Sequence, residues 1–389
     1  MSKTWWLKLE DLNDEQGPII NLPIGKSYLI TGPPGSGKTN LILLRANYLY
    51  LSGIQNIEVV VFTRTLQEFI ASGGAHYDFP VQKVKTSKRF YTDLLHRYGI
   101  AVKAPAKFKE MREYLIGETN KLIKKNNLAN IFEAILLDEG HSFLPEEIDL
   151  FSKLSKTMFI AADGQQKIYD GEDCSANMSD AVDEEYTLHF HHRIGRQICK
   201  VADALMNDSP DYQPMRDNSQ YDEVAMPSRV EPPQWFPSID EQAAKIISSL
   251  KSQLKTYPDE FLGVLCPTRK DVLYPVREAI AASDLADISV CQGDSDAVEF
   301  TPGRRIVVCT IHAAQGVEFR TVHIAGAEYL RKLHQNRNAA FTAVTRAKTN
   351  LSVYHTDTLP GYFEQAIQAA QPAKPPAKVP DVFGGKKRP

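Results

Sequence analysis

The residues best suited to chemistry form one Gly-rich octapeptide near the N-terminus. It matches the pattern GxxxxGK[ST] throughout and reads Gly32-Pro33-Pro34-Gly35-Ser36-Gly37-Lys38-Thr39. Its glycines let backbone N–H groups surround a β-phosphate, and the helix predicted to follow adds its dipole. Lys38 would neutralise the β- and γ-phosphates, and the Thr39 hydroxyl would bind Mg²⁺. The octapeptide predicts a nucleoside triphosphate site, and we count the next residue, Asn40, among its nucleotide-binding residues.

Two adjacent acids could complete this site. Asp138 and Glu139 follow the apolar run at residues 135–137, so they are expected at the end of a buried strand. Asp138 would hold Mg²⁺ through water, and Glu139 would polarise an attacking water. Acids after a strand are also common in solvated turns, and the upstream phosphate loop favours the catalytic interpretation.

Strands and helices that alternate along the chain must position these motifs. Continuous apolar runs predict strands at residues 27–31, 57–63, 134–137, 157–161, 261–266, 305–310, 321–325 and 350–354. Helical spacing of apolar residues predicts helices at 40–51, 241–254, 271–282 and 339–346. Strands that alternate with helices form parallel sheets through crossover connections, so the predicted fold class is α/β.

Composition narrows the class of protein. A chain of 389 residues allows two or three domains at about 150 residues each. Its formal charge of −3 excludes a globally basic coat, so nucleic-acid binding would have to come from local motifs. The five cysteines form no CxxC pair, which argues against a disulfide framework. No apolar run approaches the roughly 18 residues of a membrane span, and we expect a cytoplasmic protein without membrane contact.

Further motifs, in this order, resemble those of the superfamily 1 helicases, particularly the UvrD/Rep-like branch. The similar segments are LNDEQ at 12–16, VVVFT at 59–63, DEGH at 138–141, DGQQKIY at 163–169, LHFHHR at 188–193, TIHAAQGVEF at 310–319 and FTAVTRAK at 341–348. The chain departs from the family pattern at several positions. His141 stands at the fourth position of DEGH, where the family usually has Gln, His191 and His192 replace Asn and Tyr, and Gln315 replaces Lys.

The resemblance implies roles around ATP. Gln16 would read the adenine edge, and Glu318 would bind a ribose hydroxyl. Gln166 would sense the γ-phosphate. Arg193 and Arg346 would reach the γ-phosphate from the second half of the chain and stabilise the charge of the transition state.

The resemblance also implies contacts with a single strand of nucleic acid. Phe62 and Thr63 end the strand that touches its backbone in the family. Thr310 and His312 would approach the backbone from the second half, and Tyr169 would lie towards the bound strand.

We therefore expect two RecA-like P-loop NTPase domains with parallel sheets. The expected bounds are 1–185 for the first domain, with a small helical insertion at about 71–130, 186–365 for the second domain, and 366–389 for a disordered basic tail. The expected function is that of an ATP-dependent, Mg²⁺-requiring helicase or translocase moving 3′–5′ on single-stranded DNA, within a defence or repair assembly.

One alternative function retains ATP hydrolysis but couples it to control of a protein partner. The insertions are small beside the inserted subdomains of the family, which favours a regulatory ATPase subunit that switches a protein partner such as a nuclease without unwinding. The sequence leaves open whether the strand is DNA or RNA.

Overall fold

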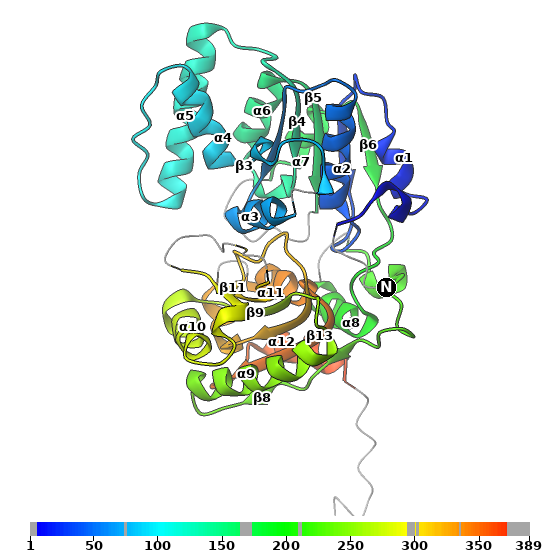
Figure 1. Cartoon of the computed structure of the whole chain (residues 1–389), viewed down its shortest axis with the longest axis vertical. Coiled ribbons are helices and arrows are strands. Elements are labelled where there is room, and N and C mark those ends of the chain that lie inside the picture. The colour runs from blue at the N-terminus through cyan, green and yellow to red at the C-terminus, as the bar shows by residue number, and fades with distance from the viewer. Residues whose placement is uncertain are drawn as a thin grey trace, which may run out of the picture.

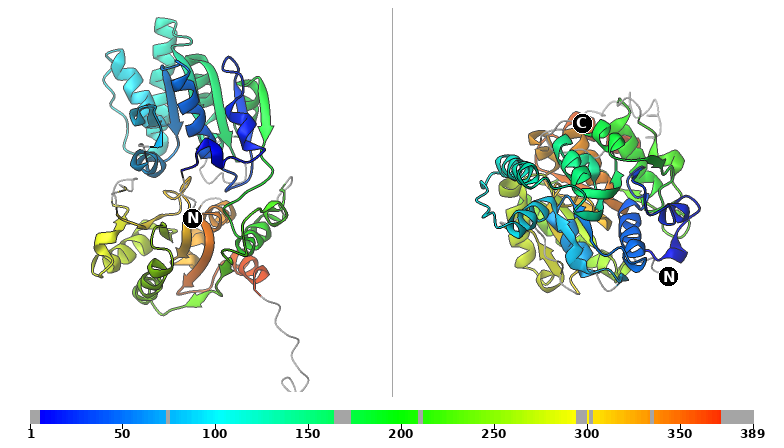
Figure 2. Two further views of the ribbon diagram at one scale, coloured as in Figure 1. Left: turned by 45° about the vertical axis from the view of Figure 1, so that its right-hand side comes forward. Right: turned by 90° about the horizontal axis from the view of Figure 1, so that it is seen from above.

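The computed structural model describes residues 6–73, 76–163, 173–208, 212–293, 300, 303–333 and 336–371. Two α/β units lie one above the other along the long axis of the molecule (Figure 1), and the left view of Figure 2 shows the same arrangement. Each is built on a parallel sheet flanked by helices. The predicted fold class, α/β with two parallel-sheet domains, is confirmed.

The first domain contains a six-stranded sheet in the order β3-β2-β4-β5-β1-β6, with every pair parallel. Its strands are β1 Tyr28–Thr31, β2 Ile57–Val61, β3 Val84–Thr86, β4 Phe132–Leu137, β5 Ser155–Ala162 and β6 Glu184–Thr187. All five residues of β2 are buried, as expected for a parallel strand covered on both faces. The sheet ends at Thr187, two residues beyond the predicted end of the first domain.

The helices of the first domain carry the predicted insertion. They are α1 Gln16–Ile20, α2 Lys38–Leu51, α3 Arg64–Ser72, α4 Ser87–Arg97, α5 Phe108–Asn126, α6 Pro145–Leu154 and α7 Ser175–Asp180. Helix α4 packs against α5, and this pair forms the helical part of the insertion. The insertion also supplies β3, which pairs with β2 at the edge of the sheet.

The second domain contains a seven-stranded sheet in the order β10-β11-β9-β12-β13-β7, with β8 paired to β13. Its strands are β7 Arg229–Val230, β8 Gln234–Trp235, β9 Leu262–Cys266, β10 Ser289–Cys291, β11 Ile306–Thr310, β12 Phe319–Ile324 and β13 Ala347–His355. Its helices are α8 Arg196–Met206, α9 Ile239–Thr256, α10 Tyr274–Ala281, α11 Asn336–Thr345 and α12 Gly361–Ala369. None of the helices in the described ranges is long and apolar enough to cross a membrane.

Helix α9 illustrates how local sequence builds these elements. Ser238 caps its start, and its hydroxyl accepts a hydrogen bond from the backbone N of Glu241 at 3.2 Å. Ala243, Ile246 and Leu250 recur at intervals of three and four residues and are buried. This spacing places the apolar side chains on one face of the helix, towards the core.

The two domains meet at the carboxyl ends of the first sheet, where each crossover leaves a strand. In the first domain this edge carries the phosphate loop after β1, Thr63 after β2 and Asp138 after β4. Phe69 of α3 packs against Phe261 and Phe300 of the second domain, with ring centroids 5.6 and 5.2 Å apart. The predicted chemistry therefore lies at the interface between the domains.

Candidate functional site

The phosphate loop runs from the end of β1 to the start of α2. Gly35 and Gly37 have φ of +75° and +90°, which L side chains rarely adopt. A Cβ on Gly37 would also lie 2.7 Å from Nε2 of Gln16. That nitrogen donates to the carbonyl of Ser36 at 2.7 Å, so Gln16 braces the loop. The loop has the glycines its conformation requires.

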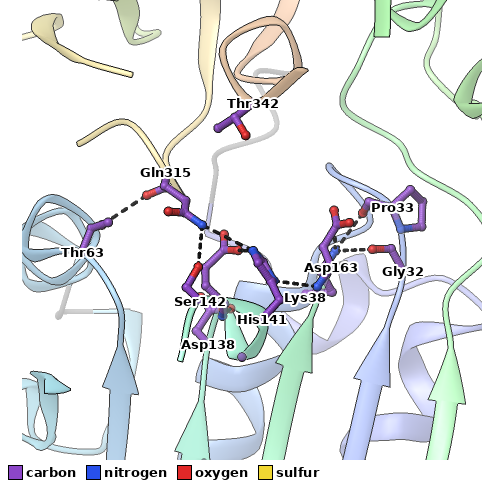
Figure 3. Close-up of polar contacts among 12 residues, drawn as sticks. Gly32, Pro33, Lys38, Thr63, Asp138, His141, Ser142, Asp163, Gln315 and Thr342 are labelled. Atoms are coloured by element: carbon purple, nitrogen blue, oxygen red, sulfur yellow. Dashed lines mark hydrogen bonds and ion pairs between the residues drawn. The ribbon is translucent and has the colours of Figure 1, made fainter. Parts of the chain in front are cut away.

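Lys38 is folded back onto its own loop (Figure 3). Its Nζ donates to the carbonyls of Gly32 at 2.6 Å and Pro33 at 2.9 Å, and lies 3.8 Å from Oδ2 of Asp163. Asp163 follows β5 at the same edge of the sheet. The ammonium group is therefore held at the mouth of the loop, where a phosphate would meet it.

Asp138 lies beside Thr39, which hydrogen-bonds to it, and is only 2% exposed. Burial, and next the neighbouring charge of Glu139, raise the pKa of Asp138 to about 7. Its Oδ2 is buried without a hydrogen-bond partner among the described residues. An uncompensated carboxylate oxygen beside a hydroxyl fits a hard cation such as Mg²⁺.

Glu139 occupies the left-handed region at φ +56°, and burial raises its pKa. His141 lies against it in the turn Gly140–Ser142, with Nε2 3.2 Å from Oε2 of Glu139. The backbone N of Asp163 donates to Nδ1 of His141 at 2.9 Å, so a neutral ring carries its hydrogen on Nε2 and donates it to Glu139. His141 therefore orients the second acid.

Gln315 reaches this turn from the second domain (Figure 3). Its Nε2 donates to the hydroxyl of Ser142 at 2.9 Å and also hydrogen-bonds to Glu139. The backbone carbonyl of Gln315 accepts a hydrogen bond from the hydroxyl of Thr63 at 3.2 Å. Both His141 and Gln315 depart from the family pattern, and the structure places them 3.4 Å apart, from Nε2 to Nε2.

The two predicted arginines line the same pocket as the acids. This pocket is lined by Pro34, Gly35, Gly37, Lys38, Thr39, Asp138, Glu139, Arg193, Gly316, Glu318 and Arg346. Nη1 of Arg193 lies 3.0 Å from Oε2 of Glu318. Burial raises the pKa of Glu318, but Arg193, Lys348 and Arg346 together outweigh burial and hold it below its usual value. The pocket thus combines three cations with three carboxylates. We call this pocket the phosphate pocket.

A second pocket, which we call the base-side pocket, adjoins the phosphate pocket through Gly35, Gly37 and Arg193, and Gln16 and His192 line this second pocket. Asn13 Nδ2 lies 2.6 Å from Nε2 of His192, which fixes the ring. A nucleotide whose phosphates lie in the phosphate pocket could place its base in this adjoining pocket. The other residues that line it include Tyr221, Arg320 and Lys348.

The predicted nucleic-acid contacts also come together. A groove between the domains, which we call the strand groove, is lined by Phe62, Thr63, Arg64, Phe108, Pro267, Arg269, Gln292, Thr310, His312 and Ala313. Burial lowers the pKa of His312, so its ring is neutral at physiological pH. Four of the five predicted contacts therefore face one groove.

Some predicted residues lie elsewhere. Asn40 is fully buried and lines neither nucleotide pocket; its Oδ1 accepts from the backbone N of Leu7, a residue of the base-side pocket, at 3.0 Å. Gly32 and Pro33 line a neighbouring hollow with Asp163. Gln166 and Tyr169 lie outside the described residues.

Several residues at these sites were not among the predicted ones. Lys348, Arg320 and Tyr221 in the base-side pocket, and Phe108 and Arg269 in the strand groove, come from segments far apart in the sequence. Only Lys348 lay in a recognisable motif, as the last residue of FTAVTRAK. The others carried no spacing signal.

Comparison with known proteins adds similarity over part of the chain. Residues 305–354 match the family of UvrD-like helicase C-terminal domains. Among solved structures, the chain is similar to the PRRSV helicase, with 17% identity and a TM-score of 0.41 over 88% of this chain and 57% of that chain. The chain thus spans a little over half the length of that helicase. No curated protein matches it.

Proposed function

We propose that the chain is an ATP-dependent helicase or translocase that hydrolyses ATP when bound to single-stranded DNA and moves along it 3′–5′. The observation that carries this proposal is the phosphate pocket, in which the residues proposed for catalysis come from both domains and line one cavity. The match of residues 305–354 to UvrD-like helicases supports it, because that segment contains Thr310, His312, Glu318 and Arg346.

The chemistry would be divided between the domains. Thr39 and Asp138 would hold Mg²⁺, which supplies positive charge to the β- and γ-phosphates. Glu139, oriented by His141, would accept a hydrogen bond from the attacking water and direct it at the γ-phosphorus. Arg193 and Arg346 would neutralise charge on the transferring group from the opposite wall.

In the base-side pocket, Gln16 and His192 would contact adenine. Glu318, which lines the adjoining phosphate pocket, would bind the ribose after it exchanges its present partner Arg193. Gln166 is proposed for the γ-phosphate and Tyr169 for the bound strand, as the family resemblance implies.

Thr63 and Gln315 connect the strand groove with the phosphate pocket. Thr63 lines the groove and donates to the carbonyl of Gln315, whose side chain contacts Ser142 beside Glu139. A strand that shifts Thr63 would therefore shift groups at the hydrolysis site. Hydrolysis that closes and reopens the domains across a bound strand would produce directed movement.

The test is steady-state ATP hydrolysis with and without single-stranded DNA or RNA. Strong stimulation by one polymer, lost in Lys38→Ala and Glu139→Gln, would establish a nucleic-acid-dependent ATPase and identify its strand. Hydrolysis that neither polymer alters would contradict the proposal.

A second candidate is a regulatory ATPase that switches a protein partner such as a nuclease. The observation that favours it is the small size of the insertion, which in the described ranges consists of α4, α5 and β3. Displacement of a short duplex strand with a single-stranded tail distinguishes the two. ATPase stimulation without displacement or movement would favour the regulatory subunit.

A further inference from the structure

We propose that Phe108, the first residue of α5, is a stacking platform for an unpaired base of a strand bound in the strand groove. This inference rests on the proposed function, since it needs a single strand in that groove. Neither the motifs nor the similarity over residues 305–354 assigns a role to this residue.

The aromatic ring of Phe108 is exposed to solvent and therefore contributes little to the hydrophobic core. It is 49% exposed and lines the strand groove from the inserted segment, while Phe62 lines it from the end of β2. The two rings meet edge to face, with centroids 6.3 Å apart at 75°. Phe62 in turn meets buried Phe143 at 5.6 Å and 86°. The rings of Phe108, Phe62 and Phe143 therefore form a series of contacts that reaches from the groove to the core, and about half of the Phe108 surface stays accessible in the groove.

A buried guanidinium supports these rings. Arg112, one turn along α5, lies 5.3 Å from the ring centroid of Phe62 and 6.0 Å from that of Phe108. Its Nε donates to Oε2 of Glu147 at 2.7 Å, and Nη2 donates to the carbonyl of Ser142 at 2.8 Å. Because these bonds fix Arg112 from two sides, the rings rest on a rigid base and little motion is lost when a base stacks.

The residues that line the strand groove around Phe108 indicate which kind of ligand it binds. Arg64 and Arg269 line the groove beside the rings, together with hydroxyl, amide and imidazole groups, and no acid lines it among the residues that the structure describes. Cations suit phosphates, and an aromatic face suits any unpaired base. The bases of a duplex are already stacked on one another and offer no face to this ring. The groove therefore fits a single strand of DNA or RNA.

The test measures the affinity of the full chain for labelled oligo(dT) and oligo(rU), and for an oligo(dT) carrying abasic sites with the same phosphates. Phe108→Ala should weaken binding of the normal oligomers about 5- to 150-fold, the range for loss of one stacked base. Phe108→Trp should bind within about threefold of wild type, while Phe108→Leu, apolar but not aromatic, should resemble Phe108→Ala.

Two controls separate stacking from damage to the fold. Trp235 of β8 is also an exposed aromatic, at 62%, and lies outside the groove, so Trp235→Ala should bind like wild type. Cooperative urea unfolding of Phe108→Ala at a midpoint close to that of wild type would show that the fold is intact, because the Phe108 ring is 49% exposed and contributes little to the core.

The abasic oligomer gives the decisive comparison. It should bind wild type more weakly than normal oligo(dT), and this difference should largely disappear in Phe108→Ala. If wild type binds the strand and Phe108→Ala binds equally well, the platform is wrong while the proposed function stands. If wild type binds neither oligo(dT) nor oligo(rU), the proposed function fails together with the stacking role of Phe108.

Discussion

Cations of the candidate phosphate pocket are held by oxygens of the protein itself. Lys38 donates to the carbonyls of Gly32 and Pro33, and Arg193 pairs with Glu318. Arg346 donates from Nε to the carbonyl of Thr342 at 3.3 Å. Such partners offset the cost of burying charge. A triphosphate would take over these bonds, so its binding should rearrange residues on both walls.

The acids of the site make stability depend on pH. Burial beside Glu139 raises the pKa of Asp138 to about 7, above the roughly 3.9 of an unfolded chain. The folded protein therefore binds this proton more tightly, and ionisation of Asp138 lowers the free energy of unfolding as pH rises from about 4 to 7. Asp138→Asn removes this penalty.

In metal-free buffer, the gain in stability of Asp138→Asn over wild type should be about 3 kcal/mol larger near pH 8 than near pH 5. Urea unfolding with a chelator present measures it. An equal difference at both pH values would show that Asp138 titrates normally. Added Mg²⁺ should reduce the gain near pH 8, since the ion would compensate the carboxylate of wild type only.

Site residues could be predicted where the backbone fixes their place. Thr39 and Asp138 follow strands of one parallel sheet, so their sequence contexts alone imply that they meet. Phe108 and Tyr221 depend on how the insertion and the second domain fold onto the first, which no local pattern records. Asn40 was predicted from its place beside the loop, yet its side chain faces Leu7.

At the scale of elements, the insertion is secured to the first domain by a buried ion pair. Arg112 of α5 and Glu147 of α6 are 7% and 0% exposed, and Glu147 also accepts from the backbone N of Leu144 at 3.0 Å. The pair therefore joins the helix that carries Phe108 to α6, and Arg112 also donates to the carbonyl of Ser142 in the turn that follows Glu139.

Arg112→Met should leave Glu147 as an isolated buried charge and lower the free energy of unfolding by about 3 kcal/mol or more. The double variant Arg112→Met/Glu147→Leu should recover most of this loss, because no unpaired charge remains. Urea unfolding measures both. As a control, Arg89→Met breaks the exposed pair with Asp93 and should cost less than about 1 kcal/mol. A double variant as unstable as the single one would argue that the charge is not the cause.

Strands were predictable where burial on both faces demands continuous apolar residues. The run at 57–63 predicted β2, and similar runs predicted β4 and β5. Strand β6 escaped prediction because EEYT is partly exposed along its length and pairs only with β1 at the edge of the sheet. Strands β7 and β8 are two residues long and carry no period that a sequence could show.

At the scale of the molecule, close approach of the domains depends on Gly316. It has φ of +82°, and a Cβ there would lie 2.6 Å from Cδ2 of Leu66, which is buried on α3 of the other domain. Gly303 has a similar φ of +85°, and no atom of the described residues lies within 4 Å of its Cβ position, which makes it a matched control.

Gly316→Ala should lower kcat for ATP hydrolysis roughly 10- to 100-fold, because Arg193 and Arg346 would be displaced from the phosphates. Gly303→Ala carries a comparable backbone strain of about 1 kcal/mol and should keep kcat within about twofold. Steady-state kinetics on both variants decide the matter. Equal effects would show that backbone strain, not separation of the domains, is responsible.

The central claim is that ATP hydrolysis requires groups from both domains, and Arg346→Gln tests it most directly. The measurement is kcat for ATP hydrolysis with saturating single-stranded nucleic acid, together with nucleotide affinity, beside the exposed control Arg304→Gln. We predict that Arg346→Gln lowers kcat about a thousandfold or more while nucleotide affinity changes far less, and that Arg304→Gln resembles wild type. A kcat for Arg346→Gln equal to that of wild type would contradict the account.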